Sequence, residues 1–273
     1  MDKKEKDESD KKSNLEGDMG GHDEILIDQL CEGLEVYQKQ SMATFLSALS
    51  AGMEIGFSFL LVAICYSQFK GVIDEDWIPY TAAFVYPLGF ILVIVGKSIL
   101  FTEQTSLLAL PVIGGRRSFQ ELMKLWAIVI AGNILGGFII GIMLLAIGQS
   151  LHVITLGGIE AIATHVAGYP ILTIFGSAIL AGWLMGLLSW SLSSIKHAVG
   201  QIMVVYIITL IIGLGGFHHS IVGNIEIFTG MLTGSINFMD YLITLIAMLL
   251  GNTFGGVFFV AFLKYRTYKA NEN

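Results

Sequence analysis

Long apolar segments, recurring along the whole chain, limit this protein to one class of fold. A helix that crosses the hydrocarbon core of a membrane needs about 20 apolar residues. The chain of 273 residues contains six stretches of that length or more, separated by short polar connections. They lie near residues 42–66, 80–112, 121–148, 169–194, 201–232 and 240–263. We therefore expect an all-α membrane protein whose transmembrane transport domain covers residues 42–265.

The few charged residues support this interpretation. Charged residues make up 14% of the chain and hydrophobic residues 54%, whereas an ordinary soluble domain is about 25% charged. Residues 1–24 alone hold 5 of the 15 Lys and Arg and 9 of the 22 Asp and Glu. The remaining charges are too few to cover a soluble protein of this size, which excludes a water-soluble enzyme. The net charge of −7 and the lack of a basic face exclude a nucleic-acid partner.

No pattern in the chain indicates a metal, a cofactor or an enzyme. The two cysteines, Cys31 and Cys65, form no CxxC pair and have no partner spacing. No nucleophile–base pair or set of metal ligands stands out by spacing either. We predict that the protein uses no cofactor and no metal, and that it is not an enzyme.

The two ends of the chain lie outside the apolar region. Residues 1–24 are rich in Asp, Glu, Lys and Ser, which predicts a disordered cytoplasmic tail. Residues 25–41 predict an amphipathic helix at the membrane surface or against the bundle, and an ordinary surface helix is an equally good interpretation. Residues 266–273 are expected to form a second cytoplasmic tail. The apolar positions of the amphipathic pattern are Leu26, Leu30, Leu34 and Tyr37.

Two of the six spans, 80–112 and 201–232, are too long and too irregular for one continuous helix. The first carries Gly96-Lys97 and Thr102-Glu103-Gln104-Thr105, and the second carries Gly215-Gly216, His218-His219 and Gly223-Asn224. Unpaired backbone groups cannot face lipid, so such interruptions belong inside protein or along a wet cavity. The N-termini of the resulting half-helices would present N–H groups and positive dipole ends, which favour a small anion.

The two halves of the sequence resemble each other. The pattern AxxAGxxxG occurs at 48–56 and again 130 residues later at 178–186, and Gly-Asn-x-x-Gly-Gly occurs at 132–137 and again 119 residues later at 251–256. Each half contains three spans, so the second half must enter the membrane upside down. We predict six transmembrane helices in two inverted three-helix repeats, with the second and fifth helices broken.

Basic residues predict the orientation. Lys and Arg gather in the connections near 116–124, at 196 and at 264–269, whereas 149–168 and 233–239 contain none. Cytoplasmic loops carry the excess of Lys and Arg. We therefore expect a multi-pass protein of the cell membrane with both termini in the cytoplasm.

The residues at the two breaks resemble a known family. Leu100-Phe101-Thr102, Gly216-Phe217-His218-His219-Ser220 and the two Gly-Asn-x-x-Gly-Gly motifs are similar to those of the formate/nitrite transporter family, and the resemblance covers roughly residues 30–265. It implies an aquaporin-like protomer, a homopentamer, and one pore per protomer. It also implies a substrate that is a small monovalent anion of a weak acid: formate, nitrite, hydrosulfide, acetate or lactate.

The resemblance also assigns roles to residues. It implies an apolar constriction of Leu100, Phe101, Thr102 and Phe217 and a central histidine, His219, that exchanges a proton with the permeating anion. A bare anion in mid-membrane is costly, whereas the neutral acid crosses an apolar neck more easily. A histidine offers a proton near neutral pH.

The chain departs from the family at several positions. His218 stands where members usually have Glu, Gln201 where members have Lys, and Gly223, followed by Asn224, where members have Asn. Ionisable residues inside membranes are functional candidates by default. We predict that Lys97 pairs with Glu54 or Glu226; alternatively, it supplies the missing pore cation. Four charged residues join His218 and Asn224 as candidates for a pore or charge network, namely Glu54, Lys97, Glu103 and Glu226. Glu103 in that role would line the pore mouth and repel anions.

Other interpretations remain open. His218 either lines the pore or is hydrogen-bonded inside the bundle, and His152 and His165 are expected in a solvated outer loop. A pore for neutral solutes such as water or ammonia is a second function, although the Asn-Pro-Ala repeats of aquaporins are missing. A non-conducting structural or signalling protein is a third.

Overall fold

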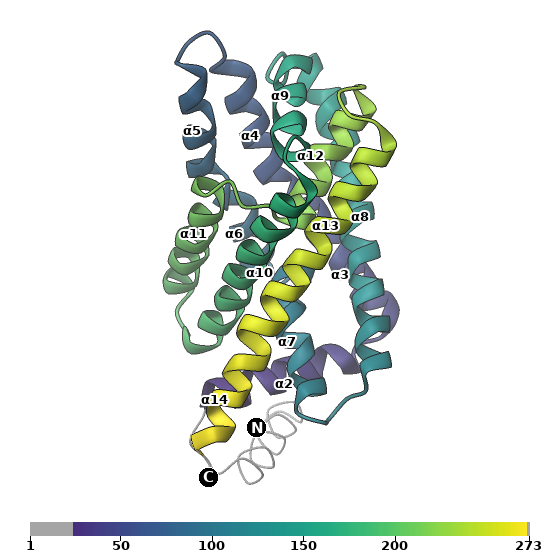
Figure 1. Cartoon of the computed structure of the whole chain (residues 1–273), viewed down its shortest axis with the longest axis vertical. Coiled ribbons are helices and arrows are strands. Elements are labelled where there is room, and N and C mark those ends of the chain that lie inside the picture. The colour runs from purple at the N-terminus through teal and green to yellow at the C-terminus, as the bar shows by residue number, and fades with distance from the viewer. Residues whose placement is uncertain (1–23, 272–273) are drawn as a thin grey trace.

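The computed structural model describes residues 24–271, and within that range the chain is helical apart from short connections and one isolated bridge between Lys70 and Ile73. The predicted tail at 1–24 lies outside these residues except for Glu24. Figure 1 shows an elongated bundle in which most long helices run roughly along its main axis, whereas α2 crosses its lower end. In the first half the helices are α2 (Glu24–Gln38), α3 (Ser41–Glu54), α4 (Gly56–Gln68), the short η1 (Glu75–Trp77), α5 (Ile78–Val85), α6 (Pro87–Val95), α7 (Phe101–Ile113) and α8 (Phe119–Ser150). In the second half they are α9 (Leu156–Ala167), α10 (Ile171–Ser194), α11 (Ala198–Leu214), α12 (Ser220–Leu232), α13 (Phe238–Phe254), the π-helical η2 (Gly255–Phe262) and α14 (Leu263–Asn271).

Five helical stretches of the described chain are long and apolar enough to cross a membrane. They are Ser41–Gln68, Glu75–Val95, Phe119–Ser150, Ile171–Ser194 and Phe238–Ala270. The apolar region predicted at 201–232 is divided into two shorter helices, α11 and α12, and the region predicted at 80–112 is divided between Glu75–Val95 and α7. The last stretch stays helical through 266–271, where a tail was expected.

The chain leaves the helical conformation at two equivalent places, residues 96–100 and 215–219. The helices that follow, α7 and α12, each have 13 residues and begin 119 positions apart. Each connection contains one residue with a positive φ angle, 55° at Lys97 and 59° at Gly216. A left-handed backbone suits glycine and strains lysine. The two halves therefore have the same turn, but only the second half has the glycine that suits it.

Glycines bring pairs of helices into close contact on both sides of the bundle. A Cβ atom added at Gly52 of α3 would collide with the carbonyl oxygen of Asn133 on α8, and one added at Gly182 of α10 would collide with that of Asn252 on α13. Small residues allow backbones to approach closely in the membrane, where packing drives association. The repeated small-residue patterns therefore form the α3–α8 and α10–α13 crossings.

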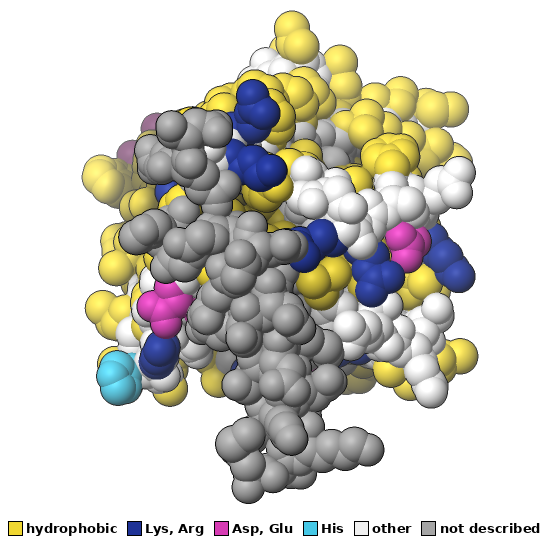
Figure 2. Space-filling view, turned by 90° about the horizontal axis from the view of Figure 1, so that it is seen from below, with side chains coloured by type: hydrophobic (Ala, Val, Ile, Leu, Met, Phe, Trp, Pro, Cys, Tyr) yellow, Lys and Arg dark blue, Asp and Glu magenta, His cyan; other side chains and the backbone are white. Residues whose placement is uncertain are grey.

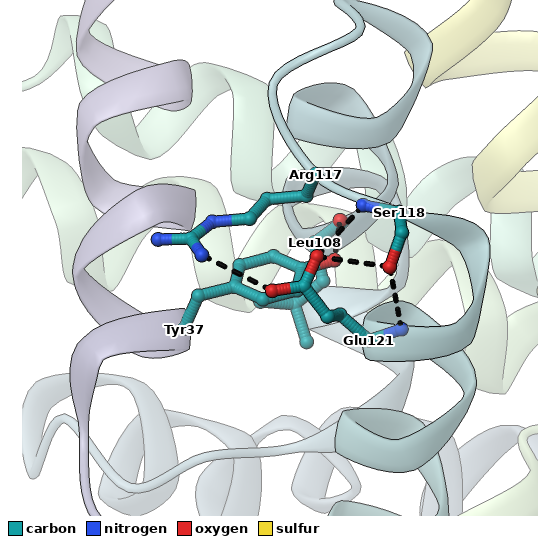
Figure 3. Close-up of polar contacts among 5 residues, drawn as sticks. All are labelled: Tyr37, Leu108, Arg117, Ser118 and Glu121. Carbon is teal, nitrogen blue, oxygen red and sulfur yellow. Dashed lines mark hydrogen bonds and ion pairs between the residues drawn. The ribbon is translucent and has the colours of Figure 1, made fainter.

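The amphipathic helix α2 lies against the bundle. Its side chains Leu26, Leu30 and Val36 are buried, and it contacts α7 and α10. At its end the Tyr37 hydroxyl donates a hydrogen bond to the Leu108 carbonyl (2.8 Å). Figure 3 shows this contact beside the start of α8, where Arg117 pairs with Glu121 (3.1 Å) and Ser118 and Glu121 form a capping box. The Arg117 guanidinium also lies 5.4 Å from the centre of the Tyr37 ring.

The two ends of the molecule differ. Helices α2 and α14 and the connection from α7 to α8 lie at the lower end of Figure 1, and the α4–α5 connection and α9 lie at the upper end. Figure 2, seen from below, shows several Lys and Arg side chains on the lower face. Helix α9 corrects one expectation: His165 lies on this helix and not in a loop, whereas His152 does lie in the connection before it.

Candidate functional site

The connections that precede α7 and α12 meet at His219 and Thr102. Atom Nε2 of His219 lies 2.5 Å from Oγ1 of Thr102 on the first turn of α7. Atom Nδ1 of His219 accepts a hydrogen bond from the backbone N–H of Val222 (3.3 Å) and so caps α12. Because Nδ1 accepts, a neutral imidazole carries its hydrogen on Nε2 and donates it to Thr102. The histidine is 2% exposed and meets the edge of the Phe90 ring, so it is fully enclosed by protein.

One asparagine fixes the connection before α7. The side-chain oxygen of Asn133 accepts a hydrogen bond from the Phe101 N–H (2.8 Å). Its NH₂ group donates to the carbonyls of Ala48 (2.7 Å) and Ile99 (2.9 Å). Asn133 is fully buried, so it satisfies backbone groups that the end of α6 and the start of α7 leave without helical partners.

An equivalent asparagine fixes the connection before α12. The side-chain oxygen of Asn252 accepts from the Ser220 N–H (2.7 Å), and its NH₂ group donates to the carbonyls of Ala178 (2.8 Å) and His218 (3.0 Å). Every partner occupies the position that corresponds to its counterpart in the first half. The Gly-Asn-x-x-Gly-Gly motifs were recognised in the sequence as a repeat, but their part in holding the interrupted helices was missed.

His218 is held by two hydrogen bonds to its ring. Atom Nε2 lies 3.0 Å from the carbonyl oxygen of Val166, and Nδ1 lies 2.8 Å from Oγ of Ser177. A carbonyl can only accept, so Nε2 carries the hydrogen and Nδ1 accepts from Ser177. His218 is therefore hydrogen-bonded inside the bundle, which was one of its two expected roles. Its ring also lines the two cavities described below.

A cavity of about 90 Å³ reaches His219 from the upper end of the molecule. We call it the histidine cavity. A larger space of about 650 Å³, which we call the vestibule, is lined by Glu75, Asp76, His165, Tyr169 and Ser177. The two share Phe217, His218 and His165 as walls. The aromatic and titratable side chains around the histidine cavity include Tyr66, Tyr86, Phe217, His218, His219 and Glu226.

The residues expected in a constriction are packed on the other side of His219. Leu100, Phe101 and Thr102 are almost completely buried. Phe101 contacts Trp126 edge to face, with ring centres 5.9 Å apart. Phe217 is half-buried and faces the two cavities. The structure thus places Thr102 directly on His219 and separates Phe217 from the other three.

The predicted ion pair of Lys97 is wrong. Among the described residues, neither Glu54 nor Glu226 lies within 4.0 Å of the Lys97 ammonium, because Lys97 is exposed at the end of α6. Glu54 instead accepts a hydrogen bond from Ser50 (2.6 Å). Lys97 lies within electrostatic range of Glu32 on α2. Lys97 follows α6 in a left-handed turn, and its side chain is exposed to solvent instead of buried beside an acid.

The other candidates have different surroundings. Glu103 is buried and accepts a hydrogen bond from Gln104 (2.6 Å). Asn224 accepts from the Tyr241 hydroxyl (2.8 Å) and packs on Gly137 of α8, away from the histidine cavity. Glu226 lines the histidine cavity beside His218 and His219. In residues 24–271 no three His, Cys, Asp or Glu side chains are grouped so that they could hold a metal ion.

Sequence reasoning missed several residues of this site. Ser177, Tyr66 and Tyr86 carry no motif, and His165 was assigned to a loop. Ser177 could have been found through the repeat, because it stands 130 positions after Ser47, whose Oγ accepts a hydrogen bond from the Ile99 N–H (3.2 Å). The phenols of Tyr66 and Tyr86 reach the cavity only through the packing of α4 to α6.

Comparison with known proteins identifies the family. Residues 23–266 match the family model described as formate/nitrite transporter. The chain is 29% identical over 239 residues to "Inner membrane protein YfdC" of Escherichia coli K12, covering 86% of this chain and 74% of that protein. It is 26% identical over 210 residues to "Formate channel FocA" of Haemophilus influenzae, covering 74% and 72%. The protein is a multi-pass membrane protein that belongs to the formate/nitrite transporter family.

Solved structures share the fold. An "FNT family ion channel" superposes with a TM-score of 0.80 at 20% identity and covers 89% of this chain and 98% of that one. A "Pentameric formate channel with formate bound" superposes with a TM-score of 0.72 at 24% identity and covers 84% and 98%. The all-helical membrane fold predicted from the sequence is confirmed.

Proposed function

We propose that the protein is a channel or transporter for small monovalent anions of weak acids, such as formate or nitrite, in which His219 exchanges a proton with the permeating anion. The observation that supports this most is the hydrogen bond from His219 to Thr102, where the two interrupted helices meet in a member of this family. Two relatives whose names refer to formate add support for the substrate class.

The proposal includes six membrane spans. Glu75–Val95 with α7 would form one interrupted span, and α11 with α12 another. The matched hydrogen bonds of Asn133 and Asn252 support this arrangement, because two breaks built alike are expected from an inverted repeat of three spans. The apolar neck of Leu100, Phe101 and Thr102 would pass the neutral acid and hold back the bare anion.

The lower end of Figure 1 would face the cytoplasm. The connection from α7 to α8, which carries Arg116 and Arg117, and the start of α8, which carries Lys124, lie near α2 and α14 at that end, which agrees with the excess of Lys and Arg at the cytoplasmic side. The vestibule would then open to the outside. A pentamer is proposed by analogy with the pentameric formate channel of the same fold.

Flux measurements in proteoliposomes test the function. The wild type, His219→Ala and Lys97→Ala are compared with a panel of formate, nitrite, acetate, lactate and hydrosulfide at two pH values. Anion flux that rises as the pH falls and is lost in His219→Ala is the expected result. Flux of water or ammonia that ignores the substitution would indicate a neutral-solute pore. Lack of flux for every solute would indicate a structural or signalling protein.

A further inference from the structure

We propose that Glu226 is a second proton-exchanging group of the pore, which passes protons between water in the vestibule and the anion held in the histidine cavity. This inference rests on the proposed function and adds to it a residue that lies on the vestibule side of His219.

The Glu226 side chain points toward His219. It lies on α12 seven residues after His219 and lines the same cavity. A Cβ atom added at Gly223, one turn nearer to His219, would lie 4.0 Å from Oε2 of Glu226. The carboxyl group therefore extends along α12 toward the histidine, as helical side chains do. The small Gly223 leaves the space that it occupies.

No group of the described chain compensates this carboxyl. Within residues 24–271 it forms no ion pair and accepts no side-chain or backbone hydrogen bond, although only 9% of the residue is exposed. Glu103 differs, because Gln104 donates to it. A buried carboxyl without donor or cation must bind something mobile, either a proton or a cation. The equivalent position in α7 is occupied by Leu107. The acidic side chain of Glu226 is therefore not a feature that the two halves have in common.

The surroundings favour the proton. The carboxyl lies within electrostatic range of the phenol groups of Tyr66 and Tyr86, and the cavity of about 90 Å³ has room for more than one water molecule. No Lys or Arg lines it. The titratable groups facing α12 from the elements around it are Cys65 and Tyr66 of α4, Tyr86 before α6, His165 of α9, Tyr241 of α13, and His218 and His219 in the preceding turn.

Protons reach this cavity through the vestibule. Glu75 and Asp76 lie on the vestibule wall, and negative side chains raise the local concentration of cations, protons included. His165 stands where the two spaces join, and desolvation lowers its pKa, so near neutral pH it adds no positive charge that would hinder a proton. Both ring nitrogens of His218 already have protein partners. Glu226 is thus the proton-exchanging group that can receive protons from water in the vestibule.

The proposed step is a simple proton transfer. The O–H bond of the Glu226 carboxylic acid breaks and an O–H bond forms on the anion, which leaves a Glu226 carboxylate and a neutral acid that can pass the apolar neck. The carboxylate then takes a proton from vestibule water. For transport outward, the same steps run in reverse.

The test compares Glu226→Gln with the wild type, with Glu226→Asp, and with Glu160→Gln as the matched control on the exposed surface of α9. Formate flux into proteoliposomes is measured near pH 7 and near pH 5. We expect Glu226→Gln to reduce flux near pH 7 by about 100-fold, the usual contribution of a proton-transferring group. The loss near pH 5 should be far smaller, because more formic acid is already neutral in solution. Glu226→Asp should retain the wild-type profile in part, and Glu160→Gln in full.

Other outcomes overturn the proposal. A Glu226→Gln protein with the wild-type pH profile, or with increased flux, would show that the carboxyl does not exchange the proton or that it only repels anions. Lack of flux in the wild type would instead refute the proposed function. If Glu226→Gln does not fold, the wild type is treated with a hydrophobic carbodiimide, which modifies protonated buried carboxyls. Modification at Glu226 that inhibits flux supports the proposal, and an unmodified Glu226 in an active protein overturns it.

Discussion

The two connections that interrupt the bundle, 96–100 and 215–219, have the same backbone and different chemistry. Each has a residue with positive φ, a serine that accepts from the backbone, and an asparagine that binds three backbone groups. Yet the N-cap residue, immediately before the following helix, is Leu100 in the first connection and His219 in the second. The hydrogen-bond frame is common to both halves, and the functional side chain is specific to one.

The comparison separates structural residues from functional ones. Side chains that recur in both halves bind backbone groups that a membrane protein cannot leave unpaired. Side chains that occur in one half only, such as His218, His219 and Glu226, face the histidine cavity. Under the proposed function, the residues that differ between the halves are those expected to act in transport, and the residues that recur are those that hold the fold.

The largest effect is expected from the shared frame. Asn252→Ala would leave one buried donor and two buried carbonyls without their partner. Each unsatisfied buried group costs about 1–3 kcal/mol, so the free energy of unfolding should fall by about 3 kcal/mol or more. Thermal unfolding in detergent measures this, with Asn133→Ala expected to match it and Thr164→Ala on the surface of α9 as the control. A large difference between the two asparagines would show that the frames are not equivalent.

The role of the imidazole is tested by giving both connections the same residue at the position of His219. His219→Leu gives α7 and α12 the same N-cap residue and removes the imidazole from Thr102. We expect formate flux to fall by about 100-fold, since proton transfer typically contributes at least that much. The exposed His197→Leu is the control. Unchanged flux in a folded His219→Leu protein would contradict the role of the imidazole.

Ser177 and Ser47 should contribute unequally to the free energy of unfolding. Ser177 accepts from the His218 N–H (3.0 Å) and also binds the His218 ring, whereas Ser47 accepts only from the Ile99 N–H (3.2 Å). Replacement by alanine should therefore cost about 2 kcal/mol at Ser177 and about 1 kcal/mol at Ser47. Unfolding midpoints of both variants, measured together, provide the comparison. Equal losses would mean that the ring of His218 gains nothing from Ser177.

The smallest effect concerns the residues with positive φ. No atom lies within 4 Å of a Cβ added at Gly216, so Gly216→Ala should cost only the left-handed backbone strain of about 1 kcal/mol. Lys97→Gly should stabilise the protein by about 0.5 kcal/mol or less, because relief of strain is offset by the greater freedom of glycine in the unfolded chain. The same unfolding assay measures both. A stabilising Gly216→Ala would show that this turn differs from the one at Lys97.

Much of the fold could be read from the sequence. Segments of about 20 apolar residues specify membrane helices whatever their neighbours are, and the Gly-Asn motifs at 132–137 and 251–256 identified the repeat. The grouping of His219 with Thr102 followed from residues with a family pattern. These features depend on local composition, or on side chains that bind equivalent backbone groups in the two halves.

Other features depended on the packing of distant elements. The surroundings of Lys97 could not be predicted, because its exposure depends on how the turn after α6 is folded. Helix α9 was read as a loop, since its 12 residues are too few to stand out as a span. The bonds of His218 join a turn, a short helix and α10, which meet only in the folded chain.

The sequence by itself determined that this chain spans a membrane, that it consists of two related halves, and to which family it belongs, because apolar length and repeated motifs are local properties. Only the tertiary structure decided which ionisable side chains face the histidine cavity and which point elsewhere. The direction of each side chain depends on the rotation of its helix about its own axis and on the conformation of the turn before it. A shift of one residue in either would move a carboxyl group from the cavity to a hydrogen-bonding partner or to the surface.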